Sequence, residues 1–480
     1  MTSSLRGLRQ SLAVVTVLLA AVGIVMIYSA SAIQAQEAYG NRWYYLERHA
    51  AYLALGIVVS GLVLAMDYQW LRQHLKGLLI LSGLLLVAVL VPHVGYEVSG
   101  ARRWFRLGFL SFQPSELAQV VVILYMADVL ARKQDRLRSF VHGFLPPMLI
   151  LGTFVGLMLL QPDLGTSVAL ASVVFLMLFV SGIELVHLGP TLASAIPVLG
   201  LLIASKPYRV RRILAFANPW ADPHGAGFQL IQSLVAVGTG GIFGVGLGQS
   251  RQKLFYLPAA HTDFIFSVIA EELGLIGATA TLFLFLAFVW LGIRISLRAT
   301  DLFAQLACLG LTGLIGFKAL IHMAVATGMV PTKGLPLPFV SFGGTSLIFN
   351  LMIVALLLNM GRGRAVATAN VLPAGEPIPT PAAMQVPPTG CAQRVGSPDW
   401  RSGQGATTMA YKHRDTSRRS NAVMASRMGF PEWAGRGGAA PASLVAHGLP
   451  LSVRIAPRSL ARTHRTSANA LCAPGRGHRV

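Results

Sequence analysis

The sequence is poor in charge and in cysteine. Only 12% of its 480 residues are Asp, Glu, Lys or Arg, whereas 54% are hydrophobic; charged residues make up about a quarter of an ordinary soluble domain. This balance excludes a conventional soluble fold. The three cysteines, Cys308, Cys391 and Cys472, have neither the number nor the spacing of a disulfide framework or a metal site. Redox chemistry is therefore not indicated.

Long apolar runs replace the missing charge. A segment that crosses the hydrocarbon needs about 20 apolar residues, because its backbone groups must be hydrogen-bonded within a helix. The sequence predicts an all-α polytopic membrane protein with ten transmembrane helices, the first of them too long for the apolar core of a signal peptide. The runs are 11–32, 49–66, 76–95, 114–132, 143–161, 165–183, 187–205, 264–293, 301–330 and 345–361.

Three regions follow from these runs. Residues 1–10 form a short N-terminus, and residues 11–362 form the membrane domain. That domain includes a large loop, residues 206–263, between the seventh and eighth helices. Residues 363–480 are rich in Ala, Gly, Pro, Ser and Arg and contain no run long enough to fold or span. They are predicted to be a disordered basic tail.

The basic residues of short connections predict the orientation. Arg and Lys in such connections are retained in the cytoplasm, so both termini are expected to be cytoplasmic and the 206–263 loop extracytoplasmic. The residues on which this orientation depends are Arg6, Arg9, Arg72, Lys76, Arg132, Lys133, Arg136, Arg138, Arg294, Arg298, Arg362 and Arg364.

The predicted outer loops are unexpectedly basic. A guanidinium can bind a phosphate or pyrophosphate through two hydrogen bonds, so these loops indicate an anionic ligand on the outer side. For the long loop alone, the alternative is that long loops cross the membrane regardless of charge. The residues concerned are Arg102, Arg103 and Arg106 before the fourth helix, and Lys206, Arg209, Arg211, Arg212, Arg251 and Lys253 in the long loop.

The long loop contains two further apolar stretches, FQLIQSLVAV and GGIFGVGLG. Both are too short to span and are interpreted as re-entrant or interfacial segments. The surrounding GTGGIFGVGLGQS lacks the ending of a phosphate-binding loop and follows no strand. Close packing or flexible turns explain its glycines.

Several ionisable residues lie within or beside the predicted spans, where such groups are costly and usually face a polar interior. Asp163 is interpreted mainly as a helix cap. For Glu116 and Lys318, a structural ion pair and a catalytic role are equally consistent with the sequence. Asp263, Ser267 and Glu271 share a helical face and are expected to line a polar wall.

LPAAHTDFIF places His261 and Asp263 directly before the eighth apolar run. In isolation, Asp263 is best interpreted as a helix cap. Its position beside Arg-rich outer loops favours another role, because a carboxylate near a diphosphate can act as a general base in group transfer.

Several stretches together resemble the SEDS family of peptidoglycan glycosyltransferases, over about residues 10–362. They are GARRWFRLG with QPSEL, QPDLGTS, RRILAFANPWADPHGAGFQLIQS, QKLFYLPAAHTDFIFSVIAEELG and PTKGLPLPFVSFGGTSL. NPWADP, QKLFYLP and PTKG are more similar to the cell-division members of the family than to the elongation members.

The resemblance implies polymerisation of lipid II on the outer face of the cytoplasmic membrane, together with a class B penicillin-binding transpeptidase. It implies that Asp263 is the catalytic base for the acceptor hydroxyl, and that Arg103 and Arg212 hold the pyrophosphate. Lys253, His261, Glu116 and Lys318 complete the expected substrate-binding set. A divalent cation, Mg or Mn, is compatible with this chemistry, but no ligand spacing assigns one.

The sequence departs from the family pattern at three places. Position 119 is Gln where the family usually has Lys, and the ninth helix carries Lys318 and His322 where Gln and Asn are common. We therefore expect the positive charge to have moved, so that Lys318 neutralises Glu116. Ala259 replaces a frequent Glu, which argues against a second catalytic acid there.

Other functions also suit a basic ten-helix bundle. A flippase for lipid-linked precursors, or another transporter, would need a midplane site and often has inverted repeats, and no convincing repeat is visible. Pro331, Pro336 and Pro338 interrupt the chain before the tenth helix and keep this alternative open. A structural scaffold would not need Asp263, and an elongation role is a further alternative.

Overall fold

The computed structural model describes residues 2–362 except 99, 109, 138, 255, 256 and 333. The predicted tail, 363–480, lies outside the described residues. Each of the ten predicted apolar runs coincides with a helix. These helices are α1 Thr2–Tyr39, α2 Tyr44–Ala65, α3 Tyr68–Ala88, α4 Pro114–Arg132, α5 Leu145–Leu160, α6 Leu164–Val180, α7 Leu185–Ala204, α10 Ile265–Ser296, α11 Leu302–Ala326 and α12 Thr345–Met360.

Seven segments in the described part of the chain are long and apolar enough to cross a membrane. They correspond to α1–α5, α10 and α11, whereas α6, α7 and α12 supply shorter apolar segments. The chain is therefore a mostly helical, polytopic membrane protein. The number of spans remains the prediction made from the sequence.

Most helix ends fall close to the predicted ones, with two exceptions. Helix α1 begins nine residues before and ends seven residues after its predicted run, 11–32. Helix α3 begins eight residues before the predicted start of its run, residue 76, and ends seven before its predicted end, residue 95. The carboxylate of Asp67 accepts a hydrogen bond from the backbone amide of Gln69 at 2.9 Å. This cap fixes the start of the helix where the sequence still looks polar. Hydropathy marks the apolar centre of a helix and does not reveal its polar first turn.

Residues 96–112 form a small antiparallel sheet, which the all-α prediction did not include. Its strands are β1 Tyr96–Val98, β2 Ala101–Leu107 and β3 Leu110–Phe112, in the order β1-β2-β3. Phe105 pairs with Phe112 in the β2–β3 register, and their rings stack at 6.4 Å. The sheet carries the first Arg-rich loop.

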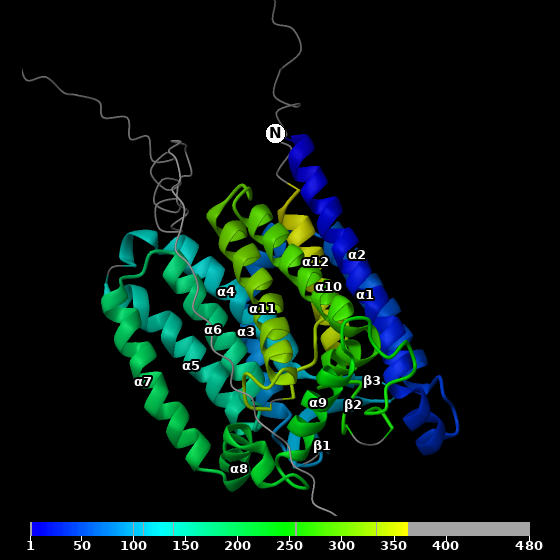
Figure 1. Ribbon diagram of the computed structural model, residues 1–480. Coiled ribbons are helices and arrows are strands. Elements are labelled where there is room, and N and C mark those ends of the chain that lie inside the picture. Colours follow the sequence, from blue (N-terminus) through cyan, green and yellow to red (C-terminus); the bar gives the residue numbers. More distant parts are fainter. Residues whose placement is uncertain are drawn as a thin grey trace, which may run out of the picture. The chain divides into compact units, whose positions relative to one another are not determined.

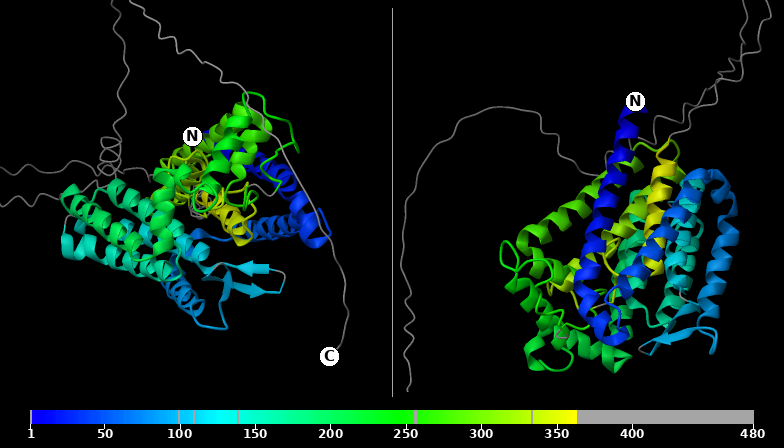
Figure 2. Two further views of the ribbon diagram at one scale, coloured as in Figure 1. Left: turned by 60° about the horizontal axis from the view of Figure 1, so that its bottom comes forward. Right: turned by 90° about the vertical axis from the view of Figure 1, so that its right-hand side faces the viewer.

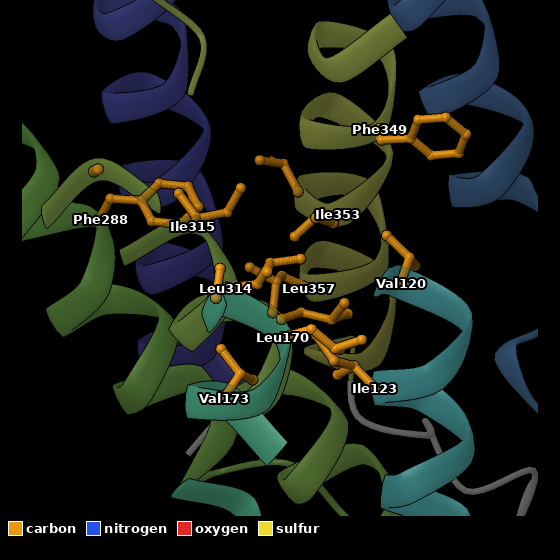
Figure 3. Packing of buried hydrophobic residues seen from close by; sticks show 14 of the residues in the cluster. Val120, Ile123, Leu170, Val173, Phe288, Leu314, Ile315, Phe349, Ile353 and Leu357 are labelled. Atoms are coloured by element: carbon orange, nitrogen blue, oxygen red, sulfur yellow. The ribbon is translucent and has the colours of Figure 1, made fainter. Parts of the chain in front are cut away.

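The centre of the bundle is built from α4, α6, α11 and α12. Figure 3 shows side chains of these helices meeting in one apolar cluster, among them Ile123, Leu170, Leu314 and Leu357. All four are buried. Burial of an aliphatic side chain contributes roughly 1.5–3 kcal/mol relative to water, although packing rather than water exclusion drives helix association inside a bilayer.

Besides the short 3-10 helix η3 Pro219–Ala221, the 206–263 loop contains two α-helices, α8 Pro207–Ala217 and α9 Phe228–Thr239. Both lie, with the three strands, at the end of the helices opposite the N-terminus of α1 (Figure 1). The right-hand view of Figure 2 shows the same arrangement, with the strands and the N-terminus at opposite ends. At the other end, Gly361, directly after α12, lies close to Arg9 of α1: a Cβ placed on Gly361 would be 3.5 Å from the Arg9 side chain.

The segment after α9 inserts its backbone into a break in α10. At the break, Gly274 has φ 67° and ψ −164°. The carbonyls of Glu271 and Glu272 accept hydrogen bonds from Val245 and Gly246, and the amides of residues 275 and 276 donate to residues 241 and 242. Backbone groups freed by the break are thus satisfied by protein, as membrane burial requires.

Close approach explains why this segment is rich in glycine. A Cβ on Gly244 would lie 2.2 Å from the carbonyl oxygen of Glu272, and one on Gly274 would lie 2.3 Å from the amide nitrogen of Gly244. Both distances are too short for any side chain. The interpretation of this stretch as a packing device, rather than a phosphate-binding loop, is confirmed.

Candidate active site

Asp263 lies just before α10 and does not cap it. The N-cap residue is Phe264, and no side chain caps the helix. The amide of Asp263 donates to the carbonyl of Ala259 at 3.0 Å, which closes a tight turn. The half-buried carboxylate accepts no hydrogen bond from the described residues. The helix-cap alternative is therefore wrong, and the carboxylate is available for chemistry.

Burial raises the pKa of Asp263 to about 6. Arg212 and Arg103 lower that pKa by their positive charge, but the loss of hydration outweighs them. A carboxylate with this pKa is ionised at neutral pH and is a stronger base than an exposed aspartate. This is the tuning expected of a general base.

Arg103 reaches the site from β2. Its Nε donates to the carbonyl of Gln161 at 2.9 Å, and an Nη donates to the carbonyl of Pro162 at 2.6 Å. The second Nη lies 3.8 Å from a carboxylate oxygen of Asp163. Asp163 itself caps α6 through the amide of Thr166 at 3.4 Å, as predicted. These contacts fix the guanidinium at the turn between α5 and α6.

Arg212 reaches the site from α8. Its side chain is exposed, and one Nη donates to the carbonyl of Thr332 at 3.3 Å. Because most of its hydrogen-bonding capacity faces outward, it can receive an anion without first breaking a buried contact. The structure therefore brings together one fixed and one exposed arginine whose charges both act on Asp263.

His261 is buried, and its ring packs against Tyr45 at 4.5 Å and Phe342 at 6.0 Å. Burial lowers the pKa of His261 to about 4, so the ring is neutral at physiological pH. Its carbonyl accepts from the amide of Phe342 at 3.0 Å. His261 thus supports the turn that carries Asp263, and its predicted contact with substrate stays a prediction.

The segment between α11 and α12 holds this turn in place. Ser341 donates to the carbonyl of Thr262 at 2.7 Å, and a Cβ on Gly334 would lie 3.1 Å from a carboxylate oxygen of Asp263. In the sequence, this segment is notable only for its family resemblance and its prolines, and neither predicts its contact with Asp263. The PTKGLPLPFVSFGG stretch was the available signal, because glycine and proline are concentrated there.

Lys253 is buried, and its side chain is paired inside the fold. Its ammonium lies 2.8 Å from a carboxylate oxygen of Glu272 and 3.2 Å from the hydroxyl of Ser29. Ser29 also donates to Glu272 at 2.6 Å. The ammonium is therefore satisfied inside the fold, and its predicted role in substrate binding remains a prediction.

The polar residues expected to line a wall along α10, Ser267 and Glu271, are buried and hydrogen-bonded within the protein. Glu271 accepts from the hydroxyl of Ser250 at 2.5 Å and from the amide of Arg251 at 2.9 Å. The hydroxyls of Ser267 and Ser233 lie 2.6 Å apart. Because these groups are buried and paired, Asp263 differs from the carboxylates that follow it on α10.

Glu116 and Lys318 form the expected ion pair. Their charged atoms lie 2.7 Å apart between α4 and α11, and both side chains are buried. Gln119, which stands where the family usually has Lys, donates to the carbonyl of Thr166 at 3.1 Å. The relocation of the positive charge to Lys318 agrees with this geometry, whereas contact of the pair with substrate stays a prediction.

No group of three or more His, Cys, Asp or Glu side chains is arranged to hold a metal ion in the part of the chain that the structure describes. The residues around Asp263 instead supply one carboxylate and two guanidinium groups.

The chain is similar to several known proteins. Residues 9–365 match the family of FtsW, RodA and SpoVE, described as cell cycle proteins. A probable peptidoglycan glycosyltransferase FtsW from Geobacter sp. (strain M18) is 44% identical over 344 residues, 72% of this chain and 94% of that protein. Stage V sporulation protein E from Bacillus subtilis (strain 168) is 41% identical over 353 residues, which cover 73% of this chain and 96% of that protein.

A solved structure described as structural coordination of polymerization and crosslinking by a peptidoglycan synthase complex also resembles the chain. It aligns with a TM-score of 0.63 at 34% identity, over 74% of this chain and 98% of that chain.

Proposed function

The chain belongs to the family of FtsW, RodA and SpoVE, and from this premise we propose that Asp263 is the base of a lipid II polymerase. The protein is a peptidoglycan glycosyltransferase of the FtsW type, which fits septal wall synthesis during cell division. The observation that carries the assignment of the base is a half-buried carboxylate without a hydrogen-bond donor among the described residues, beside two arginines.

The proposed reaction is an inverting displacement. Asp263 takes the proton of the 4-hydroxyl of the acceptor GlcNAc, and that oxygen attacks C1 of the donor MurNAc from the face opposite the leaving group. The bond between C1 and the pyrophosphate oxygen breaks, and its electron pair leaves with undecaprenyl pyrophosphate. The products are a β-1,4 linkage and a protonated Asp263, which returns its proton to solvent.

The two arginines stabilise the charge that develops on the pyrophosphate. Arg103 is held in place by the turn between α5 and α6, so it needs no reorganisation when charge develops. Arg212 is exposed on α8 and is suited to receive the incoming substrate. Together they account for basic loops on the side that the orientation rule predicts to be extracytoplasmic.

We further propose ten membrane crossings, with both termini in the cytoplasm and Asp263 at the outer surface. Support comes from the match between ten apolar runs and ten helices, and from the position of Gly361 beside Arg9. A class B penicillin-binding transpeptidase is the proposed partner, in keeping with the synthase complex that the chain resembles.

The test uses purified protein with its transpeptidase partner, supplied with lipid II. Native protein and the Asp263→Ala variant are compared for glycan strands on a gel. Asp222→Asn is the matched control, because Asp222 is an exposed carboxylate of the same loop. Strands are expected from native protein and the control only. Polymerisation that survives Asp263→Ala would remove the assigned base, whereas transport of lipid II without polymerisation would favour a flippase.

A further inference from the structure

Aromatic rings gather at the turn between α1 and α2. We call Tyr28, Tyr39, Trp43, Tyr44 and Tyr45 the aromatic platform. Tyr39 stacks on Tyr44 with ring centroids 3.9 Å apart and planes 14° apart, and Trp43 stacks on Tyr28 at 4.6 Å and 20°. Tyr45 meets Tyr44 edge to face at 5.3 Å. The rings form two groups at the same turn: Tyr39, Tyr44 and Tyr45 contact one another, and Trp43, next to Tyr44 in the chain, stacks on Tyr28.

One end of the platform reaches the candidate active site. The ring of Tyr45 lies 4.5 Å from that of His261 and 5.2 Å from that of Phe342. His261 precedes Asp263 by two residues in the same tight turn. Tyr39, Tyr44 and Tyr45 are thus connected, through His261, with the turn that carries the residue proposed to act on a sugar hydroxyl.

The other end of the platform is open. Tyr39 is 53% exposed and Trp43 is 47% exposed. Helix α1 has 38 residues, many more than the about 20 that cross the hydrocarbon, so part of it must extend beyond the apolar layer. The α1–α2 turn lies at the same end of the helices as α9 and the strands (Figure 1).

The groups around Asp263 therefore differ in chemistry. Arg103 and Arg212, from β2 and α8, suit a pyrophosphate. The rings reached through His261 present aromatic faces instead, except that the guanidinium of Arg48 lies over the ring of Tyr44 at 5.4 Å. A pyranose presents several C–H groups on one face, and these carry partial positive charge. The face of an aromatic ring is negative, so the two stack favourably.

We propose that the aromatic platform binds sugar rings of the growing glycan strand as the strand leaves Asp263. This inference rests on the proposed function. Each stacked sugar slows release of the strand between additions, so the platform determines how many sugars are added before release. Tyr39 and Trp43, the exposed members, make the outermost contacts.

Membrane proteins also place tyrosine and tryptophan at the membrane surface simply as anchors, and the chain contains a matched control for this role. Trp70, in the first turn of α3, is 51% exposed and contacts the ring of His74 at 4.3 Å, with the two planes tilted by 32°. It resembles Trp43 in exposure and in ring contact but lies at the opposite end of α2. An anchoring role predicts similar behaviour for the two tryptophans, whereas strand binding predicts an effect only at Trp43.

The test measures strand length at equal consumption of lipid II, using the complex with the transpeptidase. Tyr39→Leu and Trp43→Leu keep apolar bulk and remove the aromatic face, Tyr39→Phe and Trp43→Phe keep the face, and Trp70→Leu is the control. We expect the first two variants to make strands roughly two- to tenfold shorter, from the usual strength of aromatic contacts. The phenylalanine variants and Trp70→Leu should give native lengths.

Native strand length from Tyr39→Leu and Trp43→Leu would overturn the inference and leave the proposed function intact. Loss of the co-purifying transpeptidase in these variants would also overturn it, because the platform would then be a protein contact. If native protein makes no strands at all, the proposed function fails and the inference fails with it. Retained length in the phenylalanine variants shows that the complex is folded and that the ring face is what matters.

Discussion

Asp263 and the pair Glu271 and Glu272 are separated by little more than two helical turns, yet their surroundings are opposite. Glu271 and Glu272 accept hydrogen bonds from Ser250, Ser29, Lys253 and backbone amides, and both are buried. Asp263 is half-buried and receives no donor from the described residues. Of these three acids, two are thus paired inside the fold, and the third, Asp263, is the proposed base.

The difference shows how a membrane protein keeps an acid reactive. Burying a charge is costly unless partners replace its hydration. At Glu271 and Glu272 the replacement is complete, so the charges hold the 240–254 segment against α10. At Asp263 only the charges of two arginines replace the lost hydration, without a hydrogen bond, and the pKa stays raised at about 6.

Removing the carboxylate of Asp263 is expected to give the largest effect on activity. Asp263→Asn should lower the rate of lipid II polymerisation by about 10²–10⁴-fold, the usual contribution of a general base. Because the folded-state pKa is raised, folding is favoured below it and disfavoured as the carboxylate ionises at higher pH. At pH 7 the thermal midpoint of the variant should therefore equal or exceed that of native protein. A lower midpoint would show that Asp263 is structural after all.

Removing Glu272 is expected to give the opposite pattern. Glu272→Gln leaves the buried ammonium of Lys253 without its carboxylate, and loss of one partner of a buried pair costs about 3–5 kcal/mol. The measurement is chemical or thermal unfolding in detergent. The control is the double variant Glu272→Gln with Lys253→Met, which should regain most of the lost stability. A single variant as stable as native protein would contradict the structural role.

The sequence was sufficient for the features that depend on local pattern. Apolar runs predicted the ten helices, because the hydrocarbon requirement acts on consecutive residues. Asp263 was singled out by a local feature too, a carboxylate directly before an apolar run. The pairing of Glu116 with Lys318 could be predicted only because a charge absent at position 119 had to be replaced elsewhere.

Features that depend on distant contacts could not be predicted. The partner of Lys253 on the α1 side is Ser29, 224 positions away, and nothing local reveals it. The three strands were missed because they are short and lie in an Arg-rich loop that hydropathy treats as a connection. The break at Gly274 was missed because its backbone partners come from residues 241–246.

The contact between residues 241–246 and α10 can be tested by adding one methyl group, provided that the control has the same backbone conformation. Gly244→Ala places a Cβ 2.2 Å from the carbonyl of Glu272, so the segment that carries partners of Glu271 and Glu272 must shift. We expect a loss of about 1–3 kcal/mol in unfolding free energy, the usual cost of overpacking. Gly248→Ala is the control, because Gly248 has nearly the same positive φ, 80° against 82°, and a Cβ there meets no atom within 4 Å. Equal stability of the two variants would contradict the close approach.

The smallest effect concerns the charge environment of Asp263. Arg212 lowers the pKa of this carboxylate, so Arg212→Gln should raise it. The base works when it is ionised, so polymerisation by native protein should fall as the pH drops through about 6. In the variant the same fall should occur at higher pH, by less than about one unit, because the exposed guanidinium is screened by water and salt. Arg211 is an exposed neighbour on α8. The control variant Arg211→Gln should show the fall in polymerisation at the same pH as native protein. If the acidic fall in polymerisation rate moves to lower pH in Arg212→Gln, or moves equally in both variants, then Arg212 does not act on Asp263. A shift to higher pH in Arg212→Gln alone would also distinguish Asp263 from Glu271 and Glu272, since those two carboxylates accept hydrogen bonds from groups other than Arg212.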